Sequence, residues 1–393
     1  MAILRNLADR LDKIQSFQVM EVMEKARLLE LQGRDVIHLE VGEPDFTTPK
    51  AVADAGIRAM SEGKTRYTTA LGIPELRQSI AEFYQTQFGV TIDPSRVVIT
   101  PGASGAISLL TALLFNPGDG VLLPDPGYPC NETALRLVGA KPQIVPVDAS
   151  TGFQLSGDLL QQHWNPETKG AWLASPSNPT GTIIEPNEMA VIKKGVDQQS
   201  GVLLVDEIYH CLSYGQQPHT VLSLDTPQEN LFVINSFSKY FNMTGWRLGW
   251  LVAPGEAVPQ LEKLAQNFYL SAPTVAQYAA LEAFTESTLA LCEKRREELD
   301  KRRRYLLSQL PKLGFAIPCA PQGAFYIYCD VSAITHDSFS FCYDLIDAVG
   351  VAVTPGIDFG QHQAHRFIRI AYTQELDRLG EAVERIEQFI KQK

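Results

Sequence analysis

The chain has 393 residues, of which 45% are hydrophobic and 20% charged, and its formal net charge is −11 at pH 7. This composition is typical of a globular protein, and at about 150 residues per domain the length predicts two or three domains. This net negative charge argues against a surface that binds nucleic acid or an anionic membrane. No apolar run reaches the roughly 18 residues that a membrane-spanning helix needs.

The cysteines and histidines show no metal-binding pattern. The six cysteines are scattered without a Cys-x-x-Cys pair, and no zinc-type histidine spacing occurs. We therefore expect no metal ion, and free thiols in a reducing compartment. Asp9, Asp12 and Lys13 lie where a signal peptide would have its apolar segment, which favours a cytoplasmic protein.

Taken in chain order, the sequence first predicts a helix at residues 18–32 and a strand-like run at 36–41. Short apolar runs then alternate with amphipathic stretches, at residues 97–100, 120–124, 143–146, 170–174, 202–206, 231–236 and 249–253. Between the first two runs, residues 105–115 predict a buried helix that ends at Asn116-Pro117-Gly118-Asp119. This alternation is typical of an α/β domain with a largely parallel sheet.

The last part of the chain has a different pattern. Residues 273–310 are strongly helical, and the charged run within them predicts a solvated helix face. Then follow a predicted strand at 325–331, a helix near 339–349, a strand at 366–371 and a terminal helix. We therefore expect residues 1–44 to join a small α+β domain, residues 45–284 to form a large domain, and residues 285–393 to form the rest of the small domain.

The segment from Ser236 to Gly249 carries the strongest functional signal. Lys239 stands among hydroxyl residues, and Arg247 follows it between two glycines. A free lysine has a pKa of about 10.4, but burial or nearby positive charge lowers this value enough for a Schiff base to form with a carbonyl group. Ser236, Ser238 and the planar guanidinium of Arg247 suit a phosphate group. A phosphate-bearing carbonyl compound held on a lysine describes pyridoxal phosphate.

This segment resembles the lysine attachment signature of the class-I and class-II aminotransferases, which are pyridoxal-phosphate enzymes of fold type I. The resemblance extends through several motifs, in the family order, from Gly42 to Arg369. It implies a large α/β domain with a seven-stranded, mostly parallel sheet flanked by helices, and a smaller α+β domain built from both chain ends. It also implies that Lys239 holds the cofactor.

Two further motifs are expected to bind the cofactor ring. Asp206 ends the apolar run 202–206, so it should project from the carboxyl end of a parallel strand, where ligands of open α/β sheets gather. A carboxylate there would keep the pyridine nitrogen protonated. Tyr209 would hydrogen-bond the phenolic oxygen of the ring. The resemblance implies that Asn178, in an Asn-Pro-Thr-Gly motif, contacts the same oxygen and the substrate carboxylate.

The turn that contains Ala103 and Ser104 is expected to bind the cofactor phosphate. It lies between a predicted strand and a predicted helix, where small residues and free N–H groups favour an anion. The resemblance implies that both residues belong to one anion cradle, together with Ser236, Ser238 and Arg247. Of the two serines, we expect Ser236 to make the more important contact.

The remaining assignments also follow from the resemblance. Tyr128 matches the aromatic residue that stacks on the cofactor ring, and Tyr67 the tyrosine that reaches the phosphate of the neighbouring subunit, which implies a homodimer with shared active sites. Gly42 and Arg369 match the residues that approach the substrate, where the arginine binds its carboxylate. The sequence departs from many relatives at Asn131, where they have a tyrosine.

The resemblance implies pyridoxal-phosphate-dependent transamination between an L-amino acid and a 2-oxo acid, with ping-pong kinetics. Lys239 would act as general base and acid, with Asp206 and Tyr209 completing the catalytic set. Two alternatives share the cofactor motifs: a carbon–sulfur β-lyase, and a non-catalytic sensor of the kind fused to a DNA-binding domain. The acidic charge argues against the sensor.

The sequence leaves the substrate open. Aspartate, alanine, aromatic and branched-chain amino acids all remain possible donors, with 2-oxoglutarate or pyruvate as the expected acceptors. Cys319, Tyr326 and residues 362–365 are candidates for shaping the pocket, but the sequence assigns them no role.

Overall fold

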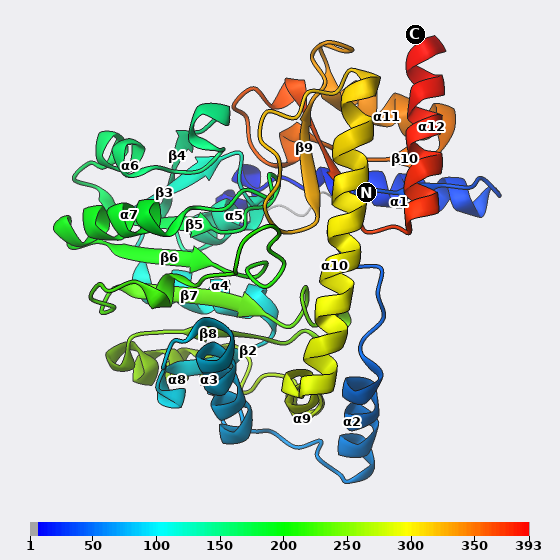
Figure 1. Ribbon diagram of the computed structural model, residues 1–393. Helices are drawn as coiled ribbons and strands as arrows, with labels where there is room; N and C mark the ends of the chain where they lie inside the picture. The colour runs from blue at the N-terminus through cyan, green and yellow to red at the C-terminus, as the bar shows by residue number, and fades with distance from the viewer. Residues whose placement is uncertain (1–6, 393) are drawn as a thin grey trace.

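The central element of the fold is a seven-stranded sheet with the strand order β2-β8-β7-β6-β5-β3-β4 (Figure 1). The computed structural model describes residues 7–392. The strands are β2 (Val97–Thr100), β3 (Gly120–Asp125), β4 (Lys141–Pro146), β5 (Thr168–Ala174), β6 (Val202–Asp206), β7 (Leu231–Ser236) and β8 (Gly249–Val252). Only β8 runs antiparallel to its neighbours, β2 and β7. The predicted seven-stranded, mostly parallel sheet is therefore confirmed.

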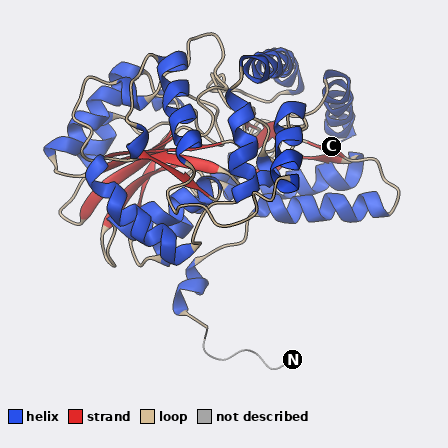
Figure 2. Ribbon diagram, turned by 90° about the horizontal axis from the view of Figure 1, so that it is seen from below, coloured by secondary structure: helices blue, strands red, loops and turns tan. Residues whose placement is uncertain are grey.

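Helices cover both faces of this sheet (Figure 2). Every residue of β7 is buried, as expected for a strand with helices on both sides. Side chains of α4 (Gly102–Leu114) and α8 (Val258–Phe268) form the core on one face, and those of α3 (Pro74–Phe88) and α7 (Pro186–Gln198) contribute to the core on the other. The helices α5 (Pro129–Leu137) and α6 (Gly157–His163) also belong to this region.

The strongly helical region predicted at 273–310 contains two helices. α9 (Thr274–Ala280) contacts α2 (Lys50–Ser61), and the long α10 (Glu286–Gln309) follows after a 3-10 turn. Phe284 in this turn packs against the rings of Phe83, Phe237 and Phe241. This aromatic contact anchors the turn to the core of the large sheet and accompanies the break in the helix.

The two ends of the chain meet in two small sheets at the far end of α10 (Figure 1). β1 (Ile37–His38) pairs in parallel with β10 (Val351–Ala352), and β12 (Phe367–Ala371) lies between β11 (Thr354–Pro355) and β9 (Tyr326–Asp330). The surrounding helices are α1 (Gln18–Leu31), α11 (Ser338–Val349) and α12 (Leu376–Gln392). The strand predicted at 36–41 is thus only two residues long, because its partner strand is equally short.

The pairing of β1 with β10 supports our proposal that residues 1–44 join the C-terminal part of the chain, although the first six residues of that segment lie outside the described range. We propose that the large domain covers residues 45–284 and that residues 285–393 complete the small one. None of the helices within residues 7–392 combines the length and apolar character needed to cross a bilayer.

Candidate active site

A cavity of about 490 Å³ lies at the carboxyl ends of the central strands. Asp206 and Ser236 are the last residues of β6 and β7, and both line this cavity. The structure brings together here every predicted site residue except Tyr67, namely Gly42, Ala103, Ser104, Tyr128, Asn178, Asp206, Tyr209, Ser236, Ser238, Lys239, Arg247 and Arg369. We call it the catalytic cavity.

Lys239 follows β7 and reaches into the catalytic cavity. Its Nζ donates a hydrogen bond to the backbone carbonyl of Gly42, with an N–O distance of 2.6 Å. The same nitrogen lies 5.9 Å from the centre of the Tyr209 ring and 5.8 Å from that of Phe325. The amine is therefore held by a neutral carbonyl and two aromatic rings.

Burial lowers the pKa of Lys239 from 10.5 to about 8. The positive charges of Arg369 and Arg247 contribute to this lowering of the pKa, while the carboxylates of Glu43 and Asp206 oppose it. An amine with this pKa is about one-tenth uncharged at pH 7 and half uncharged near pH 8, whereas an ordinary lysine is almost fully protonated at both. Lys239 can therefore act as a nucleophile toward a carbonyl group and as a proton acceptor.

Asp206 is only 5% exposed, and burial raises the pKa of its carboxyl group to about 6. The backbone N–H of Ile208 donates to its Oδ1 at 3.0 Å, which, like the nearby charge of Lys239, partly offsets this rise. A buried carboxylate of this kind is stabilised by a cationic ligand. A protonated pyridine nitrogen has the required charge.

Two tyrosine hydroxyls meet beside Lys239. The Tyr209 and Tyr326 hydroxyl oxygens lie 2.8 Å apart, and burial raises the pKa of Tyr209 well above its usual value. Tyr326 also lies close to Gly42, where a Cβ atom would stand 2.2 Å from its hydroxyl oxygen. Only glycine fits at this position without displacing the tyrosine. Tyr326, which the sequence left without a role, thus lies at the centre of the site.

The N-terminus of α4 forms one end of the catalytic cavity. α4 begins at Gly102, earlier than the predicted start at residue 105, so Ala103 and Ser104 lie in its first turn and not in a loop. Gly249 on β8 allows this close approach, since a Cβ there would lie 2.9 Å from the Ala103 nitrogen. The first N–H groups of a helix lack internal partners and attract anions.

Hydroxyl groups and an arginine complete this end of the cavity. The Ser236 hydroxyl oxygen lies 2.9 Å from that of Ser238 and accepts a hydrogen bond from the Ser238 backbone N–H at 3.1 Å. Arg247 is exposed, and a Cβ added to Gly102 would lie 3.0 Å from its Nη2. These donors and the helix N-terminus form a cradle that fits a phosphate group.

Arg369 lies in the middle of β12 and is 3% exposed. Its Nη1 donates to Asn178 Oδ1 at 2.8 Å, and its Nη2 donates to the backbone carbonyl of Glu40. The guanidinium lies between the rings of Tyr326, at 4.3 Å, and Phe359, at 4.7 Å. Within residues 7–392 its Nε has no hydrogen-bond partner. A buried arginine with an unpaired donor suits a substrate carboxylate.

Tyr67 is the predicted site residue that the structure does not bring to the cavity. It is 80% exposed. Tyr128 does line the catalytic cavity, and its ring stacks on that of Phe17 with a centroid distance of 6.4 Å. Phe17 and Glu43 also line the cavity. Phe17 carries no sequence signal, and Glu43 follows the predicted Gly42 but was assigned no role.

The residues of the site fit pyridoxal phosphate, which has a ring nitrogen, an aldehyde and a phosphate along its length. Asp206 suits the nitrogen, Lys239 suits the aldehyde, and the cradle at α4 suits the phosphate. A metal site is not supported, since the described residues contain no group of histidine, cysteine, aspartate or glutamate side chains that would hold an ion.

Comparison with known proteins gives the same result. The family model described as "Aminotransferase class I and II" matches residues 34–386. The chain belongs to this family. It is 38% identical to a valine–pyruvate aminotransferase of Mycobacterium tuberculosis, over 94% of this chain and 95% of that protein. It is 36% identical to a (5-formylfuran-3-yl)methyl phosphate transaminase of Methanocaldococcus jannaschii, over 98% and 99% of the two chains.

The structural comparison agrees. The crystal structure of an aminotransferase from Mycobacterium tuberculosis matches this aminotransferase with a TM-score of 0.95 and 38% identity, over 99% of this chain and 100% of that one. The protein is therefore a fold type I enzyme that depends on pyridoxal phosphate and transfers an amino group between an amino acid and a 2-oxo acid. Ping-pong kinetics are general to this family.

Proposed function

We propose that the donor amino acid and the acceptor oxo acid bind in turn in the catalytic cavity, with the α-carboxylate on Arg369 and Asn178. The observation that carries this proposal is the meeting of Lys239, Asp206 and Arg369, from three distant segments, around one cavity. The unpaired Arg369 Nε and the Asn178 amide can both face the same carboxylate.

Pyridoxal phosphate, when bound, supplies an electron sink for the bonds of the substrate α-carbon. Lys239 Nζ removes the proton from this carbon, since its lowered pKa makes the uncharged amine far more populated near neutral pH than that of an ordinary lysine. Arg369 orients the substrate so that the bond to this proton faces the amine.

The other assigned residues hold the cofactor. Asp206 balances the positive charge of the ring nitrogen, and Tyr209 donates a hydrogen bond from its hydroxyl group, which stays protonated because its pKa is raised. Tyr128 covers one face of the ring. The phosphate is held by the first turn of α4 with the side chains of Ser104, Ser236, Ser238 and Arg247.

Product analysis tests this function. The purified enzyme, loaded with cofactor and mixed with a donor alone, should release one equivalent of oxo acid and then stop until an acceptor oxo acid is added. Initial rates at several acceptor concentrations should give parallel reciprocal lines. Continuous release of ammonia and oxo acid without an acceptor would instead show a lyase.

We also propose a homodimer in which Tyr67 of each chain reaches the active site of the other. The 80% exposure of this tyrosine supports the proposal, since a large exposed aromatic side chain suits a contact between subunits. Light scattering should give twice the mass of the chain. A monomer would contradict the proposal.

Mixing two inactive variants tests whether the site is shared. Lys239→Ala and Tyr67→Ala are each expected to lose activity. A hybrid dimer contains one site with both native residues, so mixing after mild dissociation should restore activity. If mixing restores none, Tyr67 does not act across subunits.

The location of the enzyme is a further part of the proposal. All six cysteines are free, which supports a reducing compartment and hence the cytoplasm. Cell fractionation checks this directly, and recovery in an oxidising compartment would contradict it.

A further inference from the structure

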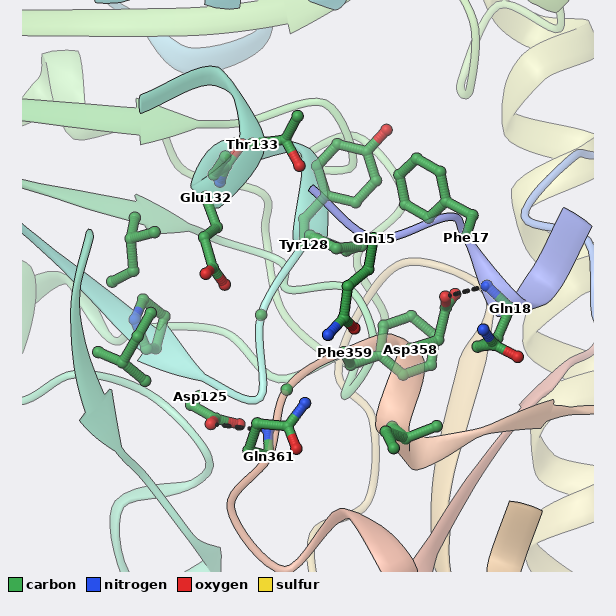
Figure 3. Close-up of a pocket in the computed structure, with 18 of the residues that line it drawn as sticks. Gln15, Phe17, Gln18, Asp125, Tyr128, Glu132, Thr133, Asp358, Phe359 and Gln361 are labelled. Carbon is green, nitrogen blue, oxygen red and sulfur yellow. Dashed lines mark hydrogen bonds between the residues drawn. The ribbon is translucent and has the colours of Figure 1, made fainter. Parts of the chain in front are cut away.

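A second cavity, of about 820 Å³, shares part of its lining with the catalytic cavity. Figure 3 shows the residues around this second cavity. We call it the side cavity. Phe17, Tyr128 and Ala174 line both cavities. The stacked rings of Phe17 and Tyr128 therefore form part of the boundary between them. A substrate whose carboxylate lies on Arg369 would have its α-carbon in the catalytic cavity and its side chain within reach of this boundary.

The lining of the side cavity combines apolar and acidic groups. The apolar part consists of Leu123, Ile144, Trp172, Phe339, Ile357 and Phe359. The carboxyl groups in the lining are those of Glu21, Asp125, Glu132 and Asp358, whereas the cations are Lys13 and Arg136. A cavity of this composition binds apolar groups well and is unfavourable for an additional carboxylate.

The arginine of this lining is already paired. Arg136 donates through both Nε and Nη2 to Glu132 Oε1, with distances of 3.0 and 2.5 Å. Both residues belong to α5, one turn apart, and Figure 3 shows the Glu132 side chain extending from this helix into the cavity. Lys13, the other cation, is exposed to solvent. A second substrate carboxylate would therefore lie near the Glu132 carboxylate, and neither cation of this lining is both buried and unpaired.

Asn131 adds to the size of the cavity. It is 6% exposed, lies on α5 beside Glu132, and its Oδ1 has no partner within the described residues. This is the position at which the sequence departs from the tyrosine of many relatives. A tyrosine there would fill part of the space that Asn131 leaves.

From these observations we propose that the side cavity receives the substrate side chain and selects monocarboxylic amino acids with uncharged, largely apolar side chains. Asn131 and Glu132 are the residues that set this preference: the first leaves room, and the second repels dicarboxylic substrates and keeps Arg136 occupied. This inference rests on the proposed binding of the substrate carboxylate by Arg369.

A donor panel gives the first test. Valine, leucine and phenylalanine should show kcat/KM values at least about tenfold above those of aspartate and glutamate, the ratio that one modest unfavourable charge contact produces. Equal or higher values for aspartate or glutamate would overturn the inference while leaving transamination intact. If no donor reacted, the proposed function itself would fail.

If no donor reacted, direct binding measurements would still test the preference of the side cavity. Isothermal titration of the cofactor-loaded enzyme with 4-methyl-2-oxopentanoate and 2-oxoglutarate compares an apolar with a dicarboxylic oxo acid, without turnover. The apolar oxo acid should bind at least about tenfold more tightly. Tighter binding of 2-oxoglutarate would overturn the inference.

Variants of α5 identify the responsible residues. Glu132→Gln removes the repelling charge and releases Arg136, so the ratio of kcat/KM for glutamate to that for leucine should rise about tenfold. The double variant Glu132→Gln/Arg136→Met should lose this gain. Glu24→Gln, which releases the exposed Arg27 on α1 outside both cavities, is the matched control and should leave the ratio unchanged. No rise in the Glu132→Gln ratio would exclude this role.

Asn131→Tyr tests whether the side chain enters the cavity. The kcat/KM for leucine should fall about tenfold relative to that for alanine, which does not reach past Tyr128. The alanine rate and the melting temperature report whether the variant folds. If leucine and alanine were affected equally, the substrate side chain would not occupy the side cavity.

Discussion

Burial and nearby positive charge both lower the pKa of the Lys239 amine. The sequence identified this lysine from its neighbours, but its lowered pKa depends on burial and on the charge of Arg369, which reaches it only in the folded protein. The chemistry of the site therefore depends on long-range contacts as much as on the local motif.

Covalent capture of the cofactor should follow the ionisation of Lys239. The folded pKa lies below the value of 10.5, so the amine is half neutral near pH 8, where an ordinary lysine is almost fully protonated. The rate at which the cofactor-free enzyme captures pyridoxal phosphate should rise about tenfold per pH unit below this pH and level off above it. Stopped-flow absorbance checks this, and a midpoint near pH 10 would contradict it.

Arg369 should be sensitive even to a conservative change. Arg369→Lys keeps the charge but loses the planar donor pair, so KM for the donor amino acid should rise about a hundredfold. Arg369→Met also removes a positive charge near Lys239 and should shift the capture midpoint to higher pH. Steady-state kinetics and the capture profile measure both effects. An unchanged KM would show that the carboxylate binds elsewhere.

At the scale of elements, the close approach of β8 to the N-terminus of α4 builds the phosphate cradle. Gly249→Ala would place a Cβ atom 2.7 Å from the carbonyl carbon of Gly102 and 2.9 Å from the Ala103 nitrogen. The first turn of α4 must then move, and the dissociation constant of the cofactor should rise about tenfold or more. Equilibrium titration of the cofactor-free enzyme measures this constant.

Gly245→Ala is the matched control for this variant. It lies in the same segment, and a Cβ there would meet nothing within 4 Å. Cofactor affinity should therefore stay within about twofold of the native value. Equal losses in both variants would show that the segment as a whole, and not the contact between β8 and α4, determines affinity.

The elements that local patterns describe well were predicted well. β6 and β7 have the bounds expected from their apolar runs, since both strands are buried on both faces. β10 and β11 were not predicted, because two-residue strands carry no periodicity. The contacts of Arg369 with the Glu40 carbonyl and with Tyr326 were also missed. They depend on how the small sheets pack against the N-terminal segment.

At the scale of the whole molecule, the active site connects parts of the chain that are far apart in sequence. Groups from α4, β6, β7 and β12 line the catalytic cavity, together with Gly42 and Glu43 from the N-terminal segment. A ligand that contacts all of them stabilises only the folded state. The cofactor should therefore contribute to stability as well as to chemistry.

Removal of the cofactor should lower the melting temperature by several degrees. At a free concentration of about a thousand times its dissociation constant, a ligand that binds only the folded state adds about 4 kcal/mol to the free energy of unfolding. Calorimetry of the enzyme before and after removal measures the difference, and addition of pyridoxal phosphate should reverse it. Identical melting temperatures would contradict the account.

The most direct test of the central claim is to identify the lysine that carries the cofactor. Lys193 is fully buried as well, but its Nζ is paired with the Asp197 carboxylate at 2.6 Å and it does not line the catalytic cavity. Borohydride reduction of the loaded enzyme, followed by digestion and mass spectrometry, should find the pyridoxyl group on the peptide that contains Lys239 and on no other. A modified peptide containing a different lysine, or unchanged labelling of Lys239→Ala, would contradict the assignment of the active site.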